Sequence, residues 1–391
     1  MNTASFILQH LEAADVHRLL LSAQRYPDVD VPYAVAQIEA LRKVKDKIPL
    51  WYNTELRFPP GLSVEQSSSE RTARFKAGLF AGAAAADLTG GMGIDSYFWA
   101  HSFQHLDYVE QSAELCALAR HNFSVLGANN IAVHHTDAAD FVARATRRYD
   151  LVYLDPARRD QHKNRVFLLT DCTPDIVAMQ EPLWAITDNI LVKTSPMMDI
   201  ALALKQLRGV TKVWVVSVHN ECKEVLYRLE RNAAPETTPE IICVELGKTD
   251  KVFQTTFAHE QTSHTPQSAP LQYLYEPHAS VMKAGVFHSF GVHYGLLKLD
   301  THTHIYTSEQ PIPDIPARSF RVVATVKYDA KAVQPFVPEG KANIATRNFP
   351  DSVETMRKKL KLKDGGDVYL FGVTVAGMGK AVVVCERIEV I

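Results

Sequence analysis

The sequence lacks any long hydrophobic run. Its 391 residues are 46% hydrophobic and 22% charged, the balance of an ordinary globular protein. No stretch approaches the roughly 18 consecutive apolar residues that a transmembrane helix needs, so we expect no membrane-spanning segment. The first residues, 1–6, show no charged segment followed by an apolar core. We therefore expect no signal peptide and a cytoplasmic location.

Cysteine is also scarce. The five cysteines are scattered, odd in number and form no C-x-x-C pair, which argues against disulfides and against a structural zinc site. Histidine is more abundant, with 16 residues, but His302 and His304 alternate within a strand-like run and no acid or cysteine pattern completes a site. We expect no bound metal. The sequence contains no internal repeat and no low-complexity tract.

Net charge is small, at −2, but it is unevenly distributed. Residues 317–391 contain 13 Lys and Arg against 8 Asp and Glu, so the rest of the chain is acidic. A basic module at the end of an acidic body indicates an anionic partner, although a solvated helix face explains the same charges equally well.

The hydrophobic pattern divides the chain into parts. Residues 1–75 carry apolar side chains at helical spacing, and Ser69 is placed to cap a helix. From residue 83 onward short apolar runs alternate with amphipathic segments, which predicts β-α-β units and a mostly parallel, doubly wound sheet. The expected strands are 83–88, 106–109, 131–134, 151–154, 190–192, 213–218 and 241–244.

A small α+β region is expected at the C-terminal end. Residues 258–270 are polar and interrupted by proline, which predicts a linker. Strands are expected at 322–327, 341–346, 368–375 and 380–387, with a helix that opens at Asp351, an acid cap, and has Arg357, Lys358, Lys359 and Lys361 on its polar face. We therefore expect a helical region at 1–75, a Rossmann-like domain at 76–258, a connecting α+β segment of ferredoxin-like type at 271–316 and a basic α+β domain at 317–391.

Residues 83–95 form the most informative stretch. An apolar strand ends at Asp87 and turns through Gly90, Gly91 and Gly93 into a helical pattern. Because glycine has no Cβ, such a turn can bring bare backbone N–H groups close to a ligand.

Three further acids, Glu110, Asp137 and Asp155, follow the next three expected strands. Ligands of doubly wound sheets bind at the carboxyl ends of the strands, so we expect these acids around one site. A carboxylate at the tip of the second strand can accept both hydrogen bonds of a ribose diol, and one after the third strand can accept the exocyclic amine of adenine. The spacing thus fits an adenosine that carries an amino-acid tail.

Two alternatives stay open at this point. Residues 91–96 read G-x-G-x-x-S, close to the fingerprint of nicotinamide dinucleotide enzymes, although Asp87, Asp137 and the Asp155-Pro156 pair favour the first interpretation. An acid at the end of a strand can also simply cap the helix that follows.

The same residues carry a family resemblance. The order Asp87-Leu88-Thr89-Gly90-Gly91-Met92-Gly93, then Glu110, Asp137 and Asp155-Pro156-Ala157-Arg158, resembles class I S-adenosylmethionine-dependent methyltransferases. With further matches at 65–70, 192–196, 220–224 and 275–281, nearly the whole chain is similar to a bacterial group of these enzymes that has a C-terminal THUMP-like domain. The resemblance implies a Rossmann-like fold, S-adenosylmethionine as cofactor and an RNA-related appendage. The residues expected to bind the cofactor are Asp87, Thr89, Gly91, Gly93, Asp95, Glu110, Gln111, Asp137 and Ala138.

The end of the fourth strand is the expected transfer site. Asp155-Pro156-Ala157-Arg158 resembles the D-P-P-x element of methyltransferases that act on exocyclic amines of bases. Ala157 replaces the second proline and Arg158 stands where those enzymes often carry an aromatic residue, which argues against a base amine as target. We expect Asp155 to position the acceptor or take its proton, with Pro156, Arg158 and Lys193 as further catalytic residues. Arg158, Arg159, Lys163 and Arg165 make this loop basic, suited to clamping phosphate or to internal ion pairs.

The leading hypothesis is thus a methyltransferase that acts on RNA. One alternative is an RNA-binding or assembly protein that retains a cofactor site without catalysis. Another is a methyltransferase for a small molecule or a protein, and a nicotinamide oxidoreductase comes last. The sequence leaves the methylated atom, the RNA and the oligomeric state open.

Overall fold

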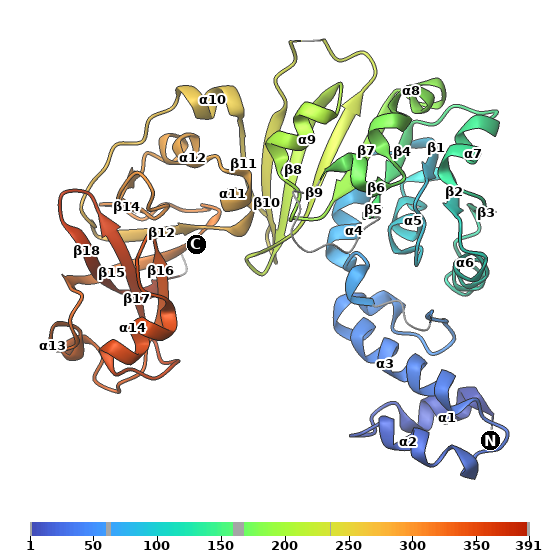
Figure 1. Cartoon of the computed structure of the whole chain (residues 1–391), viewed down its shortest axis with the longest axis horizontal. Helices are drawn as coiled ribbons and strands as arrows, with labels where there is room; N and C mark the ends of the chain where they lie inside the picture. The colour runs from blue at the N-terminus through green and yellow to red at the C-terminus, as the bar shows by residue number, and fades with distance from the viewer. Residues whose placement is uncertain (1, 60–63, 159–167, 235, 389–391) are drawn as a thin grey trace. The chain divides into compact units, whose positions relative to one another are not determined.

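The computed structural model describes residues 2–59, 64–158, 168–234 and 236–388 (Figure 1). The chain forms two compact units, each discontinuous in sequence. Unit 1 comprises Met1–Thr211 and Leu226–Thr237, and unit 2 comprises Lys212–Val225 and Thr238–Ile391. Among the described residues, no helix combines the length and the apolar character needed to cross a bilayer.

Unit 1 begins with a helical region, as predicted. Its helices are α1 (Thr3–His10), α2 (His17–Leu21), α3 (Val31–Lys47) and α4 (Glu70–Ala77), with short 3-10 turns η1 (Ala23–Arg25), η2 (Pro49–Trp51) and η3 (Val64–Gln66). Side-chain caps fix where several of these helices start. Ser69 accepts a hydrogen bond from the Thr72 backbone N–H at 3.2 Å, which confirms its predicted capping role.

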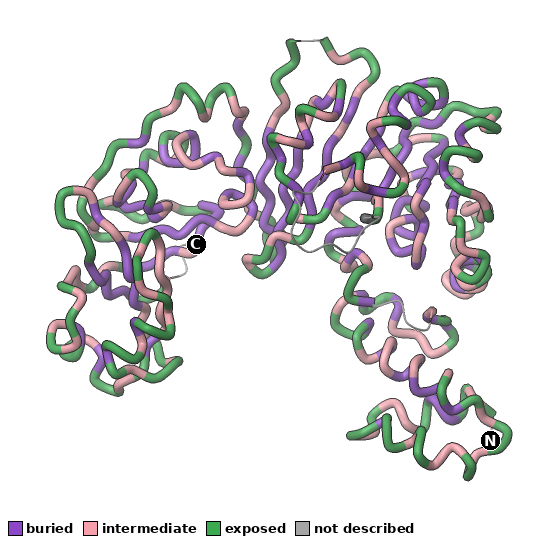
Figure 2. Tube along the Cα trace, in the orientation of Figure 1, coloured by how far each residue is buried: buried purple, intermediate pink, exposed green. Residues whose placement is uncertain are grey.

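The strands of the sheet of unit 1 are parallel, and the order in which they follow one another reverses at the centre of the sheet. Its strands are β1 (Gly82–Asp87), β2 (Phe103–Glu110), β3 (Ile131–His135), β4 (Leu151–Leu154) and β7 (Asn189–Thr194). They pair in the order β3-β2-β1-β4-β7. Strands β1, β2, β4 and β7 are mostly buried, whereas β3 at the edge of the sheet is only partly buried (Figure 2). Strand order switches between β1 and β4, the place where doubly wound sheets bind ligands.

Helices and a short ribbon connect these strands. The helices are α5 (Ile94–Trp99), α6 (Ala113–Val125), α7 (Ala138–Arg144), α8 (Ile176–Ile186) and α9 (Ile200–Gln206), and η4 (Leu169–Asp171) precedes α8. The ribbon is formed by β5 (Ala157–Arg158) and β6 (Cys172–Thr173), which pair antiparallel directly after the end of β4.

Four more strands extend the sheet to nine. They are β8 (Val210–Val218), β9 (Glu221–Glu230), β10 (Glu240–Leu246) and β11 (Lys251–Thr256), and the order is β11-β10-β8-β9-β7-β4-β1-β2-β3. All seven strands expected between residues 83 and 244 are present, and the mostly parallel, doubly wound sheet is confirmed. Strands β9 and β11 were not expected from the sequence. The turn between β8 and β9 is His219-Asn220, which contains no glycine to mark a tight hairpin.

Unit 2 contains a second sheet of seven strands, ordered β13-β14-β12-β15-β18-β17-β16. The strands are β12 (Tyr273–Pro277), β13 (Leu297–Lys298), β14 (Tyr306–Ser308), β15 (Ala317–Lys327), β16 (Asn343–Arg347), β17 (Val368–Val375) and β18 (Gly379–Ile388). Its helices are α10 (Phe257–Thr262), α11 (Ala279–Ala284), α12 (Phe287–His293), α13 (Ala330–Val333) and α14 (Val353–Leu360), and η5 (Gln334–Phe336) follows α13. Phe320, Phe371 and Val383 belong to the core on one face, while Met356 and Leu360 of α14 pack with Leu370 and Val382 on the other.

Two local expectations for unit 2 were wrong. The segment 258–270 is not a free linker, because α10 occupies its start and the Glu260 carboxylate accepts the backbone N–H groups of His288 and Ser289, each at 2.8 Å. This carboxylate satisfies N–H groups in the first turn of α12, which a local polar pattern does not reveal. Helix α14 is capped by Ser352 instead of Asp351, whose carboxylate accepts the Tyr328 hydroxyl at 2.7 Å.

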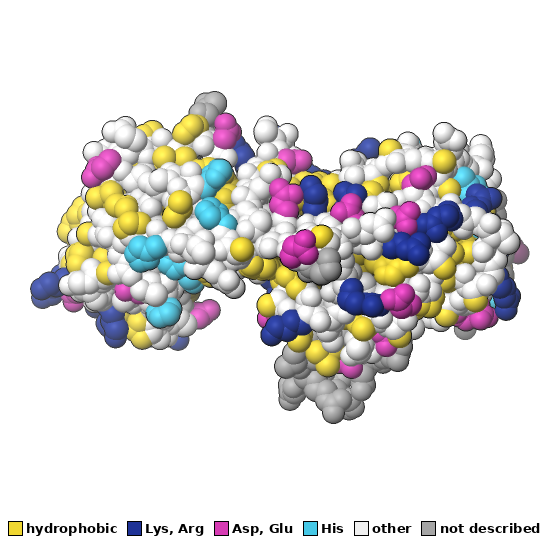
Figure 3. Space-filling view, turned by 90° about the horizontal axis from the view of Figure 1, so that it is seen from above, with side chains coloured by type: hydrophobic (Ala, Val, Ile, Leu, Met, Phe, Trp, Pro, Cys, Tyr) yellow, Lys and Arg dark blue, Asp and Glu magenta, His cyan; other side chains and the backbone are white. Residues whose placement is uncertain are grey.

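The surface contains both basic and acidic side chains, in keeping with the small net charge of the chain. On the face shown in Figure 3, basic and acidic side chains are interspersed with hydrophobic and polar ones. No described group of three His, Cys, Asp or Glu side chains is arranged to hold a metal ion.

Candidate active site

Asp87 ends β1 at the centre of the sheet of unit 1. Ala84, Ala85 and Ala86 before it are buried, and Asp87 itself is 1% exposed. Its Oδ1 accepts the Thr89 backbone N–H at 3.0 Å, and its Oδ2 accepts the Ser96 hydroxyl at 2.5 Å. Burial raises the pKa of Asp87 from 3.8 to about 7, and the hydrogen bonds from Ser96 and Thr89 only partly oppose this. Asp87 is therefore a buried residue that stabilises the turn through its hydrogen bonds with Thr89 and Ser96.

The glycine turn after Asp87 is shaped by close packing. A Cβ on Gly90 would lie 2.2 Å from the ring of Tyr108, and one on Gly93 would lie 2.7 Å from the ring of Phe123. Gly93 also has a φ of +82°, a conformation that L side chains rarely adopt. The turn was expected to offer bare N–H groups, but the N–H groups of Gly90 and Gly93 donate to the carbonyls of Val109 and Gly90. The role of Gly90 and Gly93 is thus to allow the close packing and the backbone hydrogen bonds of the turn.

Glu110 ends β2 and is held in place by this turn. Its Oε2 accepts the Gly91 backbone N–H at 3.0 Å, and its Oε1 accepts the Ser112 backbone N–H at 2.8 Å. Each carboxylate oxygen retains a second lone pair, so the oriented group can still accept two hydroxyl donors. The side chain of the next residue, Gln111, is exposed, and its carbonyl lies 3.1 Å from Nε2 of His135.

Asp137 and Ala138 lie where β3 passes into α7. Asp137 is exposed and caps α7 by accepting the Asp140 backbone N–H at 2.8 Å, while Ala138 is buried. The capping role left open for acids at strand ends is thus realised at Asp137. The cap uses Oδ1 of Asp137, and the residue as a whole is exposed.

Asp155 ends β4 in contact with β7 and with the glycine turn. Its carboxylate forms an ion pair with the ammonium of Lys193, and its backbone N–H donates to the Thr89 hydroxyl at 2.7 Å. The Lys193 side chain is 12% exposed and that of Asp155 is 36% exposed, so the pair borders solvent. Thr89 also contacts Asp87, because its hydroxyl lies 3.4 Å from Oδ1. The structure therefore brings Asp87, Thr89, Asp155 and Lys193 together.

Asp95, in the first turn of α5, belongs to a second ionic contact. The fully buried ammonium of Lys76 lies 3.2 Å from its Oδ1, and the hydroxyls of Ser68 and Tyr153 donate to its Oδ2 at 2.8 and 2.9 Å. Burial alone would raise the pKa of Asp95, but the charges of Lys76 and Lys193 hold it below its ordinary value. Asp95 thus stays ionised beneath the turn.

Four contributors to this cluster escaped sequence reasoning as partners: Ser68, Lys76, Ser96 and Tyr153. Ser96 stands one residue after Asp95, a position that a helical turn directs toward the end of β1. The structure buries Lys76 completely, although lysine is a residue usually found on the surface. Nothing in the local pattern of Lys76 or Tyr153 marks either one as a partner of Asp95.

The rest of the predicted transfer site is only partly described. Pro156 follows Asp155 and is partly exposed. Arg158 lies in β5, where its backbone pairs with Cys172. The side chain of Arg158, together with Arg159, Lys163 and Arg165, lies outside the residues that the structure describes.

The cluster suits a hydroxyl-rich, cationic ligand. The carboxylates of Glu110, Asp95 and Asp155 surround the turn, whereas the cations in the cluster are Lys76 and Lys193. At dinucleotide sites the pyrophosphate lies at the start of the helix that follows the turn. Here that start carries the ionised Asp95, which would repel a pyrophosphate. The residues present thus fit the adenosyl and amino-acid parts of S-adenosylmethionine better than a dinucleotide.

Comparisons with known proteins place this chain in a family. A model of a ferredoxin-like domain matches residues 273–316, and a THUMP domain-like model matches residues 317–387. The solved structure of a "putative methyltransferase" from Porphyromonas gingivalis W83 is 31% identical with a TM-score of 0.88, and the match covers 99% of this chain and 98% of that one. No curated protein matches the chain.

More distant solved structures match only part of the chain. A protein described as an RNA methyltransferase candidate from Pyrococcus horikoshii is 16% identical, with a TM-score of 0.33 over 49% of this chain and 97% of that one. A methyltransferase candidate from Escherichia coli is 17% identical, with a TM-score of 0.33 over 45% and 92%. Similarity this low carries no argument about function. The full-length match shows the family: the chain belongs to that of the P. gingivalis protein, methyltransferases with a C-terminal THUMP-like domain.

Proposed function

We propose that this methyltransferase uses S-adenosylmethionine and acts on RNA, with Asp155 and the basic loop after it at the transfer site. The observation that carries the proposal is Glu110, whose carboxylate is oriented by two backbone N–H groups at the tip of β2. A preoriented carboxylate loses little side-chain entropy when it binds a ribose diol. Asp137 and Ala138, at the neighbouring tip of β3, would border the adenine.

Asp155 and Lys193 would act on the acceptor. S-adenosylmethionine, when bound, supplies a methyl group on a sulfonium centre. The ion pair with Lys193 orients the Asp155 carboxylate, which can accept a hydrogen bond from an acceptor N–H or O–H and hold it in line. Pro156 restricts the backbone after Asp155, and Arg158 opens the basic loop that would contact phosphate.

RNA as the substrate is supported by unit 2. Residues 317–387 match the THUMP domain-like model, and α14 carries Arg357, Lys358 and Lys359 on its solvent side. Folded RNA is recognised largely through its shape and backbone, for which a basic module with few exposed aromatic residues is adequate.

Glu110→Ala tests the cofactor site. We expect this variant to lose at least about a hundredfold in S-adenosylmethionine affinity, because two charge-assisted hydrogen bonds of about 1.5–3 kcal/mol each disappear. Isothermal titration calorimetry measures the affinity, and circular dichroism checks that the variant is folded. Glu114→Ala, an exposed acid in the first turn of α6, is the matched control and should bind normally.

Unchanged affinity in the Glu110→Ala variant would contradict the cofactor assignment. The substrate needs a second experiment, in which labelled cofactor is incubated with RNA from a strain lacking the protein and the nucleosides are analysed by mass spectrometry. No transfer to RNA, together with RNA binding that survives Asp155→Ala, would instead support a non-catalytic RNA-binding protein. Transfer with weak, salt-insensitive RNA binding would support a small-molecule or protein substrate.

A further inference from the structure

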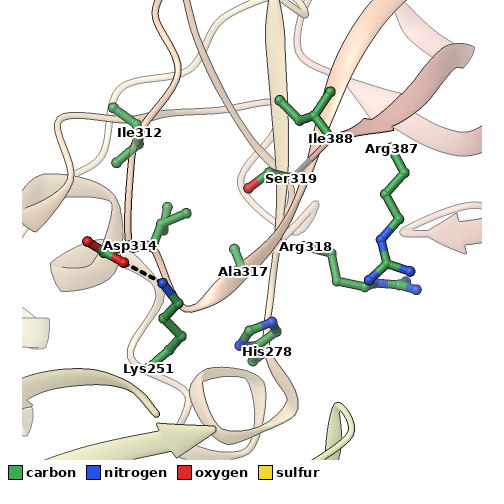
Figure 4. Close-up of a pocket in the computed structure, with 10 residues that line it drawn as sticks. Lys251, His278, Ile312, Asp314, Ala317, Arg318, Ser319, Arg387 and Ile388 are labelled. Atoms are coloured by element: carbon green, nitrogen blue, oxygen red, sulfur yellow. Dashed lines mark hydrogen bonds and ion pairs between the residues drawn. The ribbon is translucent and has the colours of Figure 1, made fainter. Parts of the chain in front are cut away.

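Unit 2 contains a hollow of about 300 Å³ that takes no part in the proposed active site (Figure 4). Its polar lining is cationic and comes from several segments: Lys251 of β11, His278 before α11, Arg318 and Ser319 of β15, and Arg387 of β18, with Asp314 as an acid. Figure 4 shows Lys251 and Asp314 on one side of the hollow and the guanidinium groups of Arg318 and Arg387 on the other.

The acids near this hollow do not balance its cations. Lys251 pairs with Asp314 at 2.5 Å, and the Asp314 side chain is 82% exposed. The buried carboxylate of Glu276 is shared between Arg318 and Arg347, so one negative charge faces two guanidinium groups.

Arg387 is exposed and has no acidic partner among the residues that the structure describes. The lining of the hollow thus contains three cationic side chains, Lys251, Arg318 and Arg387, and one carboxylate, Asp314. Cations therefore outnumber acids in the lining, while the buried carboxylates of Glu276 and Glu245 lie close to it.

Strand pairing sets the two arginines of the hollow in place. Arg318 lies opposite Glu276 of β12, and Arg387 of β18 lies opposite Phe320 on the same β15 strand. The Glu276 carboxylate is 3% exposed and accepts a hydrogen bond from Nε–H of Arg318 at 2.7 Å. The guanidinium of Arg318 is therefore held in place without a ligand. A guanidinium that is already fixed loses little entropy when it binds an oxyanion.

His278 adds an unsatisfied polar atom. Its Nδ1 is buried and has no hydrogen-bond partner among the described residues, while its backbone N–H donates to the carbonyl of Pro316 at 3.0 Å. A buried polar atom without a partner costs about 1–3 kcal/mol, so such atoms usually have one in the functional state. A ligand oxygen in the hollow would supply it.

We propose that this hollow binds a phosphoryl group, as a phosphate dianion or a phosphate monoester. Guanidinium groups match the tetrahedral oxygens of phosphate in charge and geometry, and the surplus of cationic side chains in the lining favours an anionic ligand. The hollow is larger than a phosphate ion, which leaves room for an attached organic group. The proposal concerns unit 2 alone and stands whether or not unit 1 transfers a methyl group.

Calorimetric titration of the full chain with inorganic phosphate tests the proposal. We expect saturable binding that weakens about tenfold in Arg387→Gln, because this exposed side chain can be neutralised without disturbing a buried partner. Arg321→Gln is the matched control, because this substitution removes the same charge from β15. Arg321 is exposed and pairs with Glu386 outside the hollow. The phosphate affinity of this variant should equal that of the unaltered protein.

A short RNA oligonucleotide with a 5′-phosphate, compared with its 5′-hydroxyl twin, identifies the source of the phosphoryl group. Competition with inorganic phosphate by the phosphorylated form alone supports an RNA end, and competition by neither supports a small phosphorylated molecule. Absence of saturable phosphate binding, or equal loss in Arg387→Gln and Arg321→Gln, overturns the proposal. S-adenosylmethionine titration of the same samples reports on unit 1 separately.

Discussion

A buried carboxyl group at the end of β1 couples the stability of unit 1 to pH. Native Asp87 keeps its proton up to about pH 7, whereas an unfolded aspartate releases it near pH 3.8. Between these values the native state binds more protons than the unfolded state, so the free energy of unfolding contributed by Asp87 decreases as pH rises. Above pH 7 the buried carboxyl group of Asp87 is ionised in the folded protein, and its contribution to the free energy of unfolding is at its lowest.

Asp87→Asn should remove this decrease in the free energy of unfolding. The amide can still accept from Thr89 and bond to Ser96 without a charge, so we expect the variant to gain a few kcal/mol relative to the unaltered protein between about pH 5 and pH 8, at about 1.4 kcal/mol per pKa unit. Urea unfolding at the two pH values measures the difference. Asp140→Asn, at an exposed surface acid, is the control, and parallel pH profiles for all three proteins would contradict the assignment.

At this scale the sequence indicates residue positions more readily than contacts. The positions of Glu110 and Asp155 follow from strand ends, which hydrophobic runs reveal. The burial of Asp87 and the pairing of Lys76 with Asp95 depend on how α4 packs beside α5, and no local pattern encodes that packing. The same holds for the glycine turn, whose N–H groups are used within the protein.

At the scale of elements, the β8–β9 hairpin shows how a turn can organise its neighbours. His219 and Asn220 have φ values of +53° and +58°, in the left-handed region that glycine or asparagine usually occupies. The Asn220 side chain also accepts the Ala279 backbone N–H at 2.9 Å, at the start of α11. His278 provides no side-chain cap there, so a residue distant in sequence supplies one.

Replacement of Asn220 can separate these two contributions. Asn220→Gly keeps the backbone conformation and loses the cap, which should cost about 1 kcal/mol of unfolding free energy. Asn220→Ala loses the cap and also strains the backbone, so it should cost about 2–3 kcal/mol. Chemical denaturation measures both, with His219→Ala as a control for strain alone. Equal stability of the Gly and Ala variants would contradict the proposed strain.

The parallel strands were predictable because they are short, apolar and regularly spaced. Strand β9 was not, since its ends are charged and its turn lacks glycine, and the capping of α12 by Glu260 joins segments 28 residues apart. Contacts of this kind are set by tertiary packing, which outweighs local propensity.

At the scale of the whole molecule, backbone pairing crosses the predicted boundary between residues 316 and 317. Strand β12 pairs with β15, so the ferredoxin-like and THUMP-like segments share one seven-stranded sheet. A composition shift marks where charge changes, and it carries no information about which strands pair across it.

The basic surface near the end of α14 predicts how RNA binding depends on salt. Lys358, Lys361 and Lys363 are exposed, whereas Arg357 pairs with Asp364 and Lys359 lies 3.9 Å from the centre of the Tyr328 ring. If the three exposed lysines contact RNA phosphates, their joint replacement by Gln should reduce the slope of log affinity against log salt by about 2, at roughly 0.7–0.9 per phosphate.

Fluorescence anisotropy with a labelled structured RNA, between about 50 and 300 mM KCl, measures that slope. The same charge change in unit 1, made at the exposed Arg18, Arg71 and Arg147, is the control. S-adenosylmethionine affinity should be unchanged in both triple variants, because neither set lies at the site around Glu110. Equal slopes for the unaltered protein and the lysine variant would show that RNA does not contact this surface, since three neutralised phosphate contacts must release fewer counterions.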